Sequence, residues 1–81
     1  MWKLEIYRVI TNIGGWIVAS ESEYIDDLLD AVCNMYALEY RIVSPQGEMY
    51  TINFVEQDDD YVIPRLGEIS NNWPQKIGDI R

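Results

Sequence analysis

The chain has 81 residues, with 14 acidic and 6 basic side chains, one cysteine, no histidine and a net charge of −8. This length fits one domain, and the hydrophobic share of 48% predicts a packed core rather than a disordered segment. The acidic balance argues against direct binding to nucleic acid or to an anionic membrane surface, and the lack of histidine removes the commonest general base and metal ligand.

No apolar run in the sequence approaches the ~18 residues that a membrane-spanning helix needs. The first ten residues, MWKLEIYRVI, alternate polar and apolar side chains instead of forming the continuous apolar stretch of a signal peptide. We therefore expect a cytoplasmic protein with no membrane partner.

The first half of the chain predicts a hairpin followed by a helix. Residues 2–11 alternate with period two, the glycines of NIGG (12–15) indicate a turn, and WIVA (16–19) reads as the returning strand. Ser20 and Glu23 have the spacing of a capping box. The apolar residues that follow recur at helical spacing, which predicts a helix over about 21–37.

The second half predicts another hairpin. Residues 39–44 and 48–56 alternate on either side of SPQG (44–47), which has the proline and glycine of a type I turn. DDD (58–60) indicates a further turn, and 61–65 a short edge strand that Pro64 ends. Residues 66–81 show no clean period and indicate an irregular tail, with room for one helical turn near 66–71.

These elements predict an α+β fold that occupies residues 1–81 as a single domain. The simplest arrangement is an antiparallel sheet of four to five strands, ordered ββαββ as hairpin, helix and hairpin, with one amphipathic helix packed on one face. Trp2, Tyr40, Tyr50 and Phe54 fall on the apolar stripes, so we expect them to be buried.

EQDDD (56–60) places four acids in five positions, which raises the question of a metal site. Calcium prefers oxygen ligands, but the EF-hand loop also needs alternating acids, a central glycine and a distal glutamate, and this segment has none of these. Adjacent aspartates are typical of a solvated turn. We expect no metal and no cofactor.

The predicted helix is strongly acidic. Between Val9 and Tyr40 the sequence has six acids and no base, and repelling acids three or four residues apart cost a few tenths of a kcal/mol each. One interpretation is a solvated helix face, and the other is a negative patch that binds a basic surface.

In its size, its charge, its lack of histidine and its aromatic content, the chain is similar to phage-encoded inhibitors of restriction and CRISPR enzymes. That resemblance implies carboxylates that imitate phosphates and occupy a basic groove meant for DNA or RNA.

Trp73 and Cys33 each allow two interpretations. Trp73, in NNWP, lies outside any period, so it is either an exposed interface anchor or, as the pattern favours, a lid over the open sheet face. Cys33 lies near the apolar stripe of the helix and has no histidine to activate it, so we expect it to be buried and inert.

The leading hypothesis is therefore a non-enzymatic binding protein, in its sharpest form a phage or mobile-element inhibitor that covers a basic nucleic-acid-binding surface of its target. The alternative is an assembly module that homodimerises through a strand edge or an aromatic surface. The residues expected to contact the partner are Glu23, Asp26, Asp27, Asp30, Glu56, Asp58, Asp59, Asp60 and Trp73.

Overall fold

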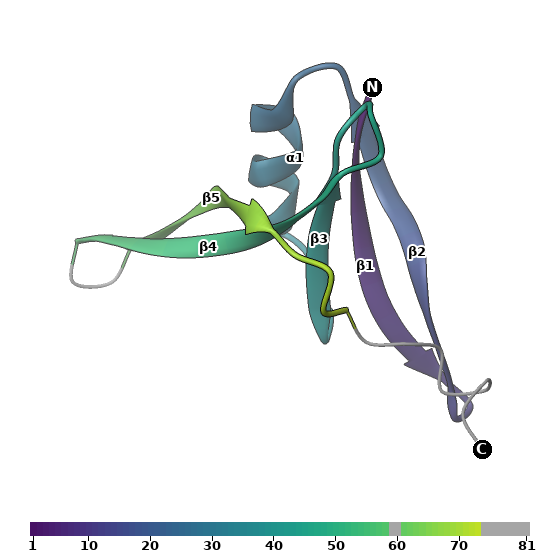
Figure 1. Ribbon diagram of the computed structural model, residues 1–81. Helices are drawn as coiled ribbons and strands as arrows, with labels where there is room; N and C mark the ends of the chain where they lie inside the picture. The colour runs from purple at the N-terminus through teal and green to yellow at the C-terminus, as the bar shows by residue number, and fades with distance from the viewer. Residues whose placement is uncertain (59–60, 74–81) are drawn as a thin grey trace.

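A computed structural model describes residues 1–58 and 61–73, and it contains a five-stranded antiparallel sheet and one short helix (Figure 1). In chain order the elements are β1 (Trp2–Ile10), β2 (Ile13–Ser22), α1 (Ile25–Val32), β3 (Glu39–Val43), β4 (Met49–Asp58) and β5 (Tyr61–Ile69). No helix among these described residues is long and apolar enough to cross a membrane.

The β1–β2 hairpin turns at Thr11 and Asn12, two positions earlier than the predicted turn at 12–15. Ile10 pairs with Ile13, and the two residues between them have φ of 51° and 67°. A two-residue loop with both central φ values positive has the twist that suits a hairpin. Gly14 and Gly15 lie in β2 instead, so the assignment of the turn to the glycines is wrong.

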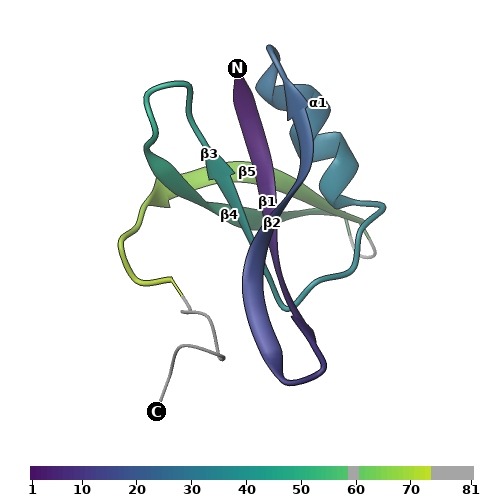
Figure 2. The ribbon, with the colours of Figure 1, turned by 90° about the vertical axis from the view of Figure 1, so that its right-hand side faces the viewer.

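The spatial order of the strands, β2-β1-β3-β4-β5, differs from that of two hairpins laid side by side in chain order. After α1 the chain returns to pair β3 with β1, which becomes an inner strand. The sheet then bends: β4 pairs with β3 only at Ile42–Tyr50 and Val43–Met49, and its outer part pairs with β5 alone. Helix α1 lies in the angle between the upright strands and the β4–β5 ribbon (Figures 1 and 2).

Helix α1 is about half as long as predicted, and the prediction of a capping box at Ser20 and Glu23 is wrong. Ser20 belongs to β2, and the N-cap residue, Tyr24, makes no side-chain capping hydrogen bond. The Ser22 hydroxyl instead accepts from the Tyr24 N–H and donates to Asp27. Because β2 continues to Ser22, these residues form backbone pairs with β1 and cannot start the helix.

The end of α1 is tightened and then held by a tyrosine. The N–H groups of Cys33, Asn34 and Met35 donate to the carbonyls three residues before them, which is the 3₁₀ pattern that closes many helices. The Tyr40 hydroxyl then accepts from the Ala37 N–H at 3.1 Å and donates to the Met35 carbonyl at 2.8 Å. The side chain of Cys33 is exposed, so its predicted burial is wrong.

The core is small and centred on the contact between the helix and the inner strands. Leu4 of β1, Ile42 of β3, and Leu28 and Val32 of α1 form its buried cluster. Burying each such side chain fully contributes about 1.5–3 kcal/mol. The partly buried residues around it are Trp2, Ile25, Ala31, Met35, Tyr40, Tyr50, Ile52 and Leu66.

Phe54 is 53% exposed, so the prediction that it is buried is wrong. Its ring makes an edge contact with Tyr40 at 6.4 Å between centroids. Phe54 lies on the part of β4 that extends beyond β3, and few residues remain there to cover it.

The turn between β3 and β4 lies at Ser44–Gly47, as predicted. The Gly47 N–H donates to the Ser44 carbonyl at 2.9 Å, and Gly47 has φ of +92°, a conformation that favours glycine. The buried Ser44 hydroxyl accepts from the N–H groups of Gln46 and Glu48, so the turn itself supplies the partner for both of these backbone donors.

Strand β5 continues through Pro64 to Ile69, so the predictions that Pro64 ends it and that an irregular tail starts at 66 are wrong. β5 is an edge strand, where a residue without an N–H is tolerated on the outer side. The register shifts between Tyr50 and Ile52, so β5 has one extra residue opposite Thr51. A Cβ at Gly67 would collide with Thr51, which explains the glycine in this bulge.

Candidate partner-binding surface

Two of the predicted acids, Asp26 and Asp30, face β5. They are exposed and, with Leu29, line a shallow hollow of about 200 Å³ whose other wall is Ile63, Pro64 and Arg65. The spacing of four residues places the two carboxylates on neighbouring turns of one helix face. This pair, which we call the helix acids, therefore shares a single wall of the hollow.

Asp27 and Glu23 lie elsewhere. Asp27 Oδ2 accepts from the Ser22 hydroxyl at 2.9 Å, toward the end of β2. Glu23 is exposed in the turn between β2 and α1. The acidic run of the sequence is thus divided by the helix into one group beside β5 and one beside β2.

The predicted acids of segment 56–60 lie on the outer part of the β4–β5 ribbon. Glu56 pairs with Val62, next to Ile63 of the hollow, and Asp58 pairs with Tyr61 further out. Figure 1 shows this end of the ribbon running away from α1. Asp59 and Asp60 lie outside the described residues.

The acids are therefore spread from the helix outward along the ribbon and do not gather at one point. In the part of the chain that the structure describes, no group of three or more acidic or cysteine side chains has the arrangement that could hold a metal ion. Such a spread surface can make separate ion pairs with several cationic groups of a partner.

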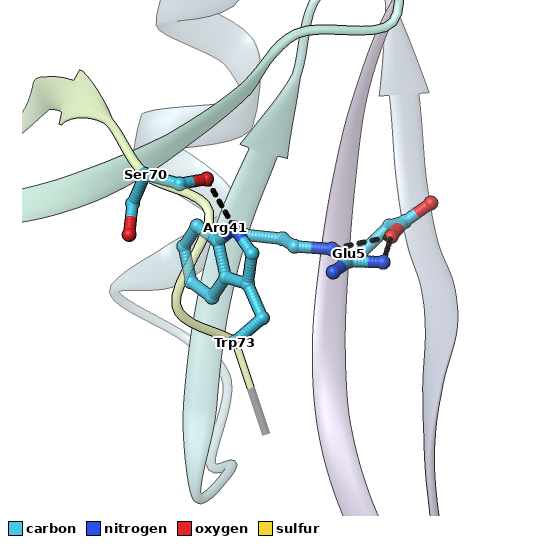
Figure 3. Close-up of polar contacts among 4 residues, drawn as sticks. All are labelled: Glu5, Arg41, Ser70 and Trp73. Carbon is cyan, nitrogen blue, oxygen red and sulfur yellow. Dashed lines mark hydrogen bonds and ion pairs between the residues drawn. The ribbon is translucent and has the colours of Figure 1, made fainter. Parts of the chain in front are cut away.

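Trp73 packs on the face of the sheet that lies opposite α1 (Figure 3). Its indole N–H donates to the Ser70 carbonyl at 2.7 Å, and its ring meets Trp16 edge-on at 5.4 Å between centroids. The guanidinium of Arg41 lies 4.0 Å from the Trp16 ring centre and 5.6 Å from that of Trp73. Trp73 is half-buried, which leaves part of the indole accessible.

Arg41 is held in this position by an acid on β1. Its Nε donates to Glu5 Oε1 at 2.7 Å, and a terminal nitrogen lies 2.6 Å from the same oxygen (Figure 3). Both side chains are largely shielded from solvent, at 12% and 16% exposure. Sequence reasoning missed this cluster, because the alternation of each strand does not reveal that Glu5 and Arg41 face each other across β1 and β3.

Sequence reasoning also missed an apolar surface on the β1–β2 hairpin. Exposed aliphatic side chains gather there and define what we call the hairpin patch, namely Val9, Ile10, Ile13, Ile17 and Val18. The sequence has no acid between Ile6 and Ser20, and this gap in the charge pattern could have indicated an uncharged surface on the hairpin.

Compared with known protein families, curated proteins and solved structures, the chain shows no significant match.

Proposed function

We propose that this protein is a non-enzymatic binding module whose acidic surface engages a basic surface of another protein. The observation that carries the proposal is the exposure of the helix acids, Asp26 and Asp30, in a helix that has no basic residue in its last turn. The proposed surface also includes Glu56 and Asp58, which lie on the outer part of the neighbouring ribbon.

The physical argument weighs the repulsion between the helix acids against the little that the fold gains from them, namely the position of Asp26 in the first turn of α1 and the nearby Arg65. Asp26 and Asp30 are four residues apart on one helix, where like charges repel by a few tenths of a kcal/mol. Neither fills the core, because both are exposed. Arginine or lysine side chains of a partner would make charge-assisted hydrogen bonds with them, and the net charge of −8 would accelerate the encounter.

The sharper form of the proposal concerns a target whose basic groove ordinarily holds DNA or RNA, as in the inhibitors that the composition resembles. Carboxylates spread along a helix and a ribbon would meet a basic groove at several points, as a phosphate backbone does. If the groove is the target, nucleic acid and this protein compete for it.

The test is a pull-down from host extract with three forms of the protein as bait. Asp26→Lys/Asp30→Lys reverses the helix acids, and Glu39→Lys/Glu68→Lys makes the same change in net charge at exposed positions outside α1. We expect a protein that the wild type and the Glu39/Glu68 variant retain, that the Asp26/Asp30 variant loses, and that high salt releases.

Adding nucleic acid to the pull-down then tests whether the acidic surface occupies a nucleic-acid-binding groove. If it does, the nucleic acid should displace the retained target protein from the wild-type bait. Retention of the same proteins by all three baits, or of none, contradicts the proposed function. Salt-sensitive retention that nucleic acid does not affect contradicts only its sharper form.

A further inference from the structure

Strand β2 is an edge of the sheet and carries the hairpin patch. β1 lies on one side of it, and no strand of the described residues lies on the other. Ile13, Ile17 and Val18 are 61%, 47% and 49% exposed. An exposed strand edge with apolar side chains is a template on which another strand can pair.

The patch occupies both faces of the hairpin. Ile17 pairs with Ile6, whereas Val18 pairs with Glu5, and adjacent residues of a strand point to opposite faces. A partner that covered one face of the sheet would leave the other set of side chains in water. A strand added at the edge contacts both sets, so the distribution of the patch favours edge pairing.

The two edges of the sheet differ in the features that prevent such pairing. β5 has Pro64, the charged residues Arg65 and Glu68, and the bulge at Gly67. These are the features by which proteins block edge-to-edge association. From Ile13 to Ser20, β2 has no proline and no charge, and its own bulge, at Ala19, lies beyond Val18.

Charge restricts what can approach this edge. The 14 acids of the chain all lie outside residues 6–20, where Arg8 is the one charged residue. A basic partner would prefer the acidic surface on the other parts of the molecule. A second copy of this acidic chain meets the least repulsion at the β1–β2 hairpin.

We propose that β2 pairs antiparallel with β2 of a second copy, about a two-fold axis that passes beside residue 16. The Tyr7 carbonyl accepts from the Leu38 N–H, so the backbone groups of Tyr7 point toward β3. Along an antiparallel ladder, the backbone N–H and C=O groups of successive residues point to alternate sides. With the register of β1 and β2, the N–H and C=O groups of Gly14 and Val18 therefore point away from β1. In this register Gly14 and Val18 of one copy exchange hydrogen bonds with Val18 and Gly14 of the other.

On either side of the axis this register sets a branched side chain against a glycine, with Ile17 opposite Gly15 and Val18 opposite Gly14, while Trp16 lies opposite Trp16 of the second copy. Ile17 would then reach the hollow of about 390 Å³ on the second copy, whose lining includes Gly14, Gly15 and Ile13. When two copies of β2 lie antiparallel, the two glycines of each copy therefore leave room for Ile17 and Val18 of the other.

This interface closes after two copies, because it uses the same edge of each. About five paired residues span roughly 17 Å, which places it at the small end of specific interfaces. We expect a dimer in reversible equilibrium with monomer at micromolar concentration. It uses none of the acids of the proposed function, so either proposal can fail without the other.

Sedimentation over a concentration series tests the proposal with two matched variants. Val18 and Val62 are both 49% exposed and lie on opposite edges. We expect Val18→Lys to weaken the dimer about tenfold or more, while Val62→Lys dimerises as the wild type does. Equal thermal midpoints at monomeric dilution show that both variants fold.

Amide hydrogen exchange on the wild type tests the register without a substitution. We expect protection of the Gly14 and Val18 amides to rise with protein concentration, while the Gly15 and Ile17 amides, which face β1, stay unchanged. A wild type that is monomeric up to millimolar concentration, association beyond a dimer, or a dimer that Val62→Lys disrupts and Val18→Lys does not, would each overturn the proposal.

Discussion

Glu5 and Arg41 form an ion pair between β1 and β3, 2.6 Å apart, and the guanidinium of that pair lies over Trp16 and near Trp73. Glu5 thereby positions the Arg41 guanidinium, which contacts the rings of two tryptophans that are far apart in the sequence. The pair links the last described residues of the chain to the middle of the sheet.

Removal of Arg41 should destabilise the protein and loosen Trp73. Arg41→Met leaves the shielded Glu5 carboxylate without its partner, so we expect a loss of about 1–3 kcal/mol in the free energy of unfolding. Urea unfolding measures the loss, and the tryptophan emission of the folded state should shift.

Glu5→Gln/Arg41→Met supplies the control, because it removes both charges. It should be less destabilised than Arg41→Met alone. If the double variant is the less stable of the two, the ion pair does not act as described.

Gly67→Ala should be poorly tolerated. A Cβ there meets the Thr51 side chain, and it lies 2.8 Å from the Thr51 carbonyl oxygen. We expect a loss of about 1–3 kcal/mol, measured by urea unfolding. Removing the Thr51 hydroxyl as well, in Thr51→Ala/Gly67→Ala, should cost less than the sum of the two single changes, and strict additivity would argue against a direct collision.

The hairpin turn offers a stabilising change. Thr11 is β-branched and has φ of 51°, a left-handed conformation that costs roughly 1–2 kcal/mol for most residues and less for asparagine. Thr11→Asn should therefore raise the thermal midpoint by a few degrees in a domain of this size. Thr51→Asn, the same change at a position of β4 where φ is not positive, should not do so, and the loss of the hydroxyl hydrogen bonds to Glu68 should lower the midpoint.

Tyr50 should make stability fall at alkaline pH. Partial burial, followed by the hydrogen bond to Glu48 and its negative charge, raises the pKa of Tyr50 above its usual 10.0. Because folding favours the protonated phenol, the contribution is complete below the usual pKa and is lost as the pH rises through the raised pKa. Urea midpoints above about pH 10 should fall less steeply in Tyr50→Phe, and identical slopes would count against the shift.

The strands were predictable where burial alternates along one segment. Residues 2–11 and 39–44 coincide closely with β1 and β3, and the Pro45–Gly47 signal placed the second turn correctly. Each of these features depends on local chemistry, so a local pattern was enough to find it.

The errors arose where distant segments decide the local structure. Ser20 and Glu23 look like a capping box, yet pairing with β1 extends β2 through Ser22 and delays the helix. Pro64 ends a strand only if its missing N–H is needed, and at an edge it is not. The acids are apparent in the sequence, but their separation into groups beside β5 and β2 follows from the rotation of α1 against the sheet.

The β4–β5 ribbon divides the molecule into parts of unequal cooperativity. From Asn53 outward, β4 has β5 as its partner and no contact with β3 in the sheet ladder, and two strands alone are marginally stable in water. The outer ribbon should therefore open in sub-global steps of low free energy while the helix and inner strands stay folded. Amide exchange should be faster for Val55 and Ile63 than for Ile42, and a protease that cuts after aromatic residues should cleave first at Phe54 or Tyr61, both largely exposed.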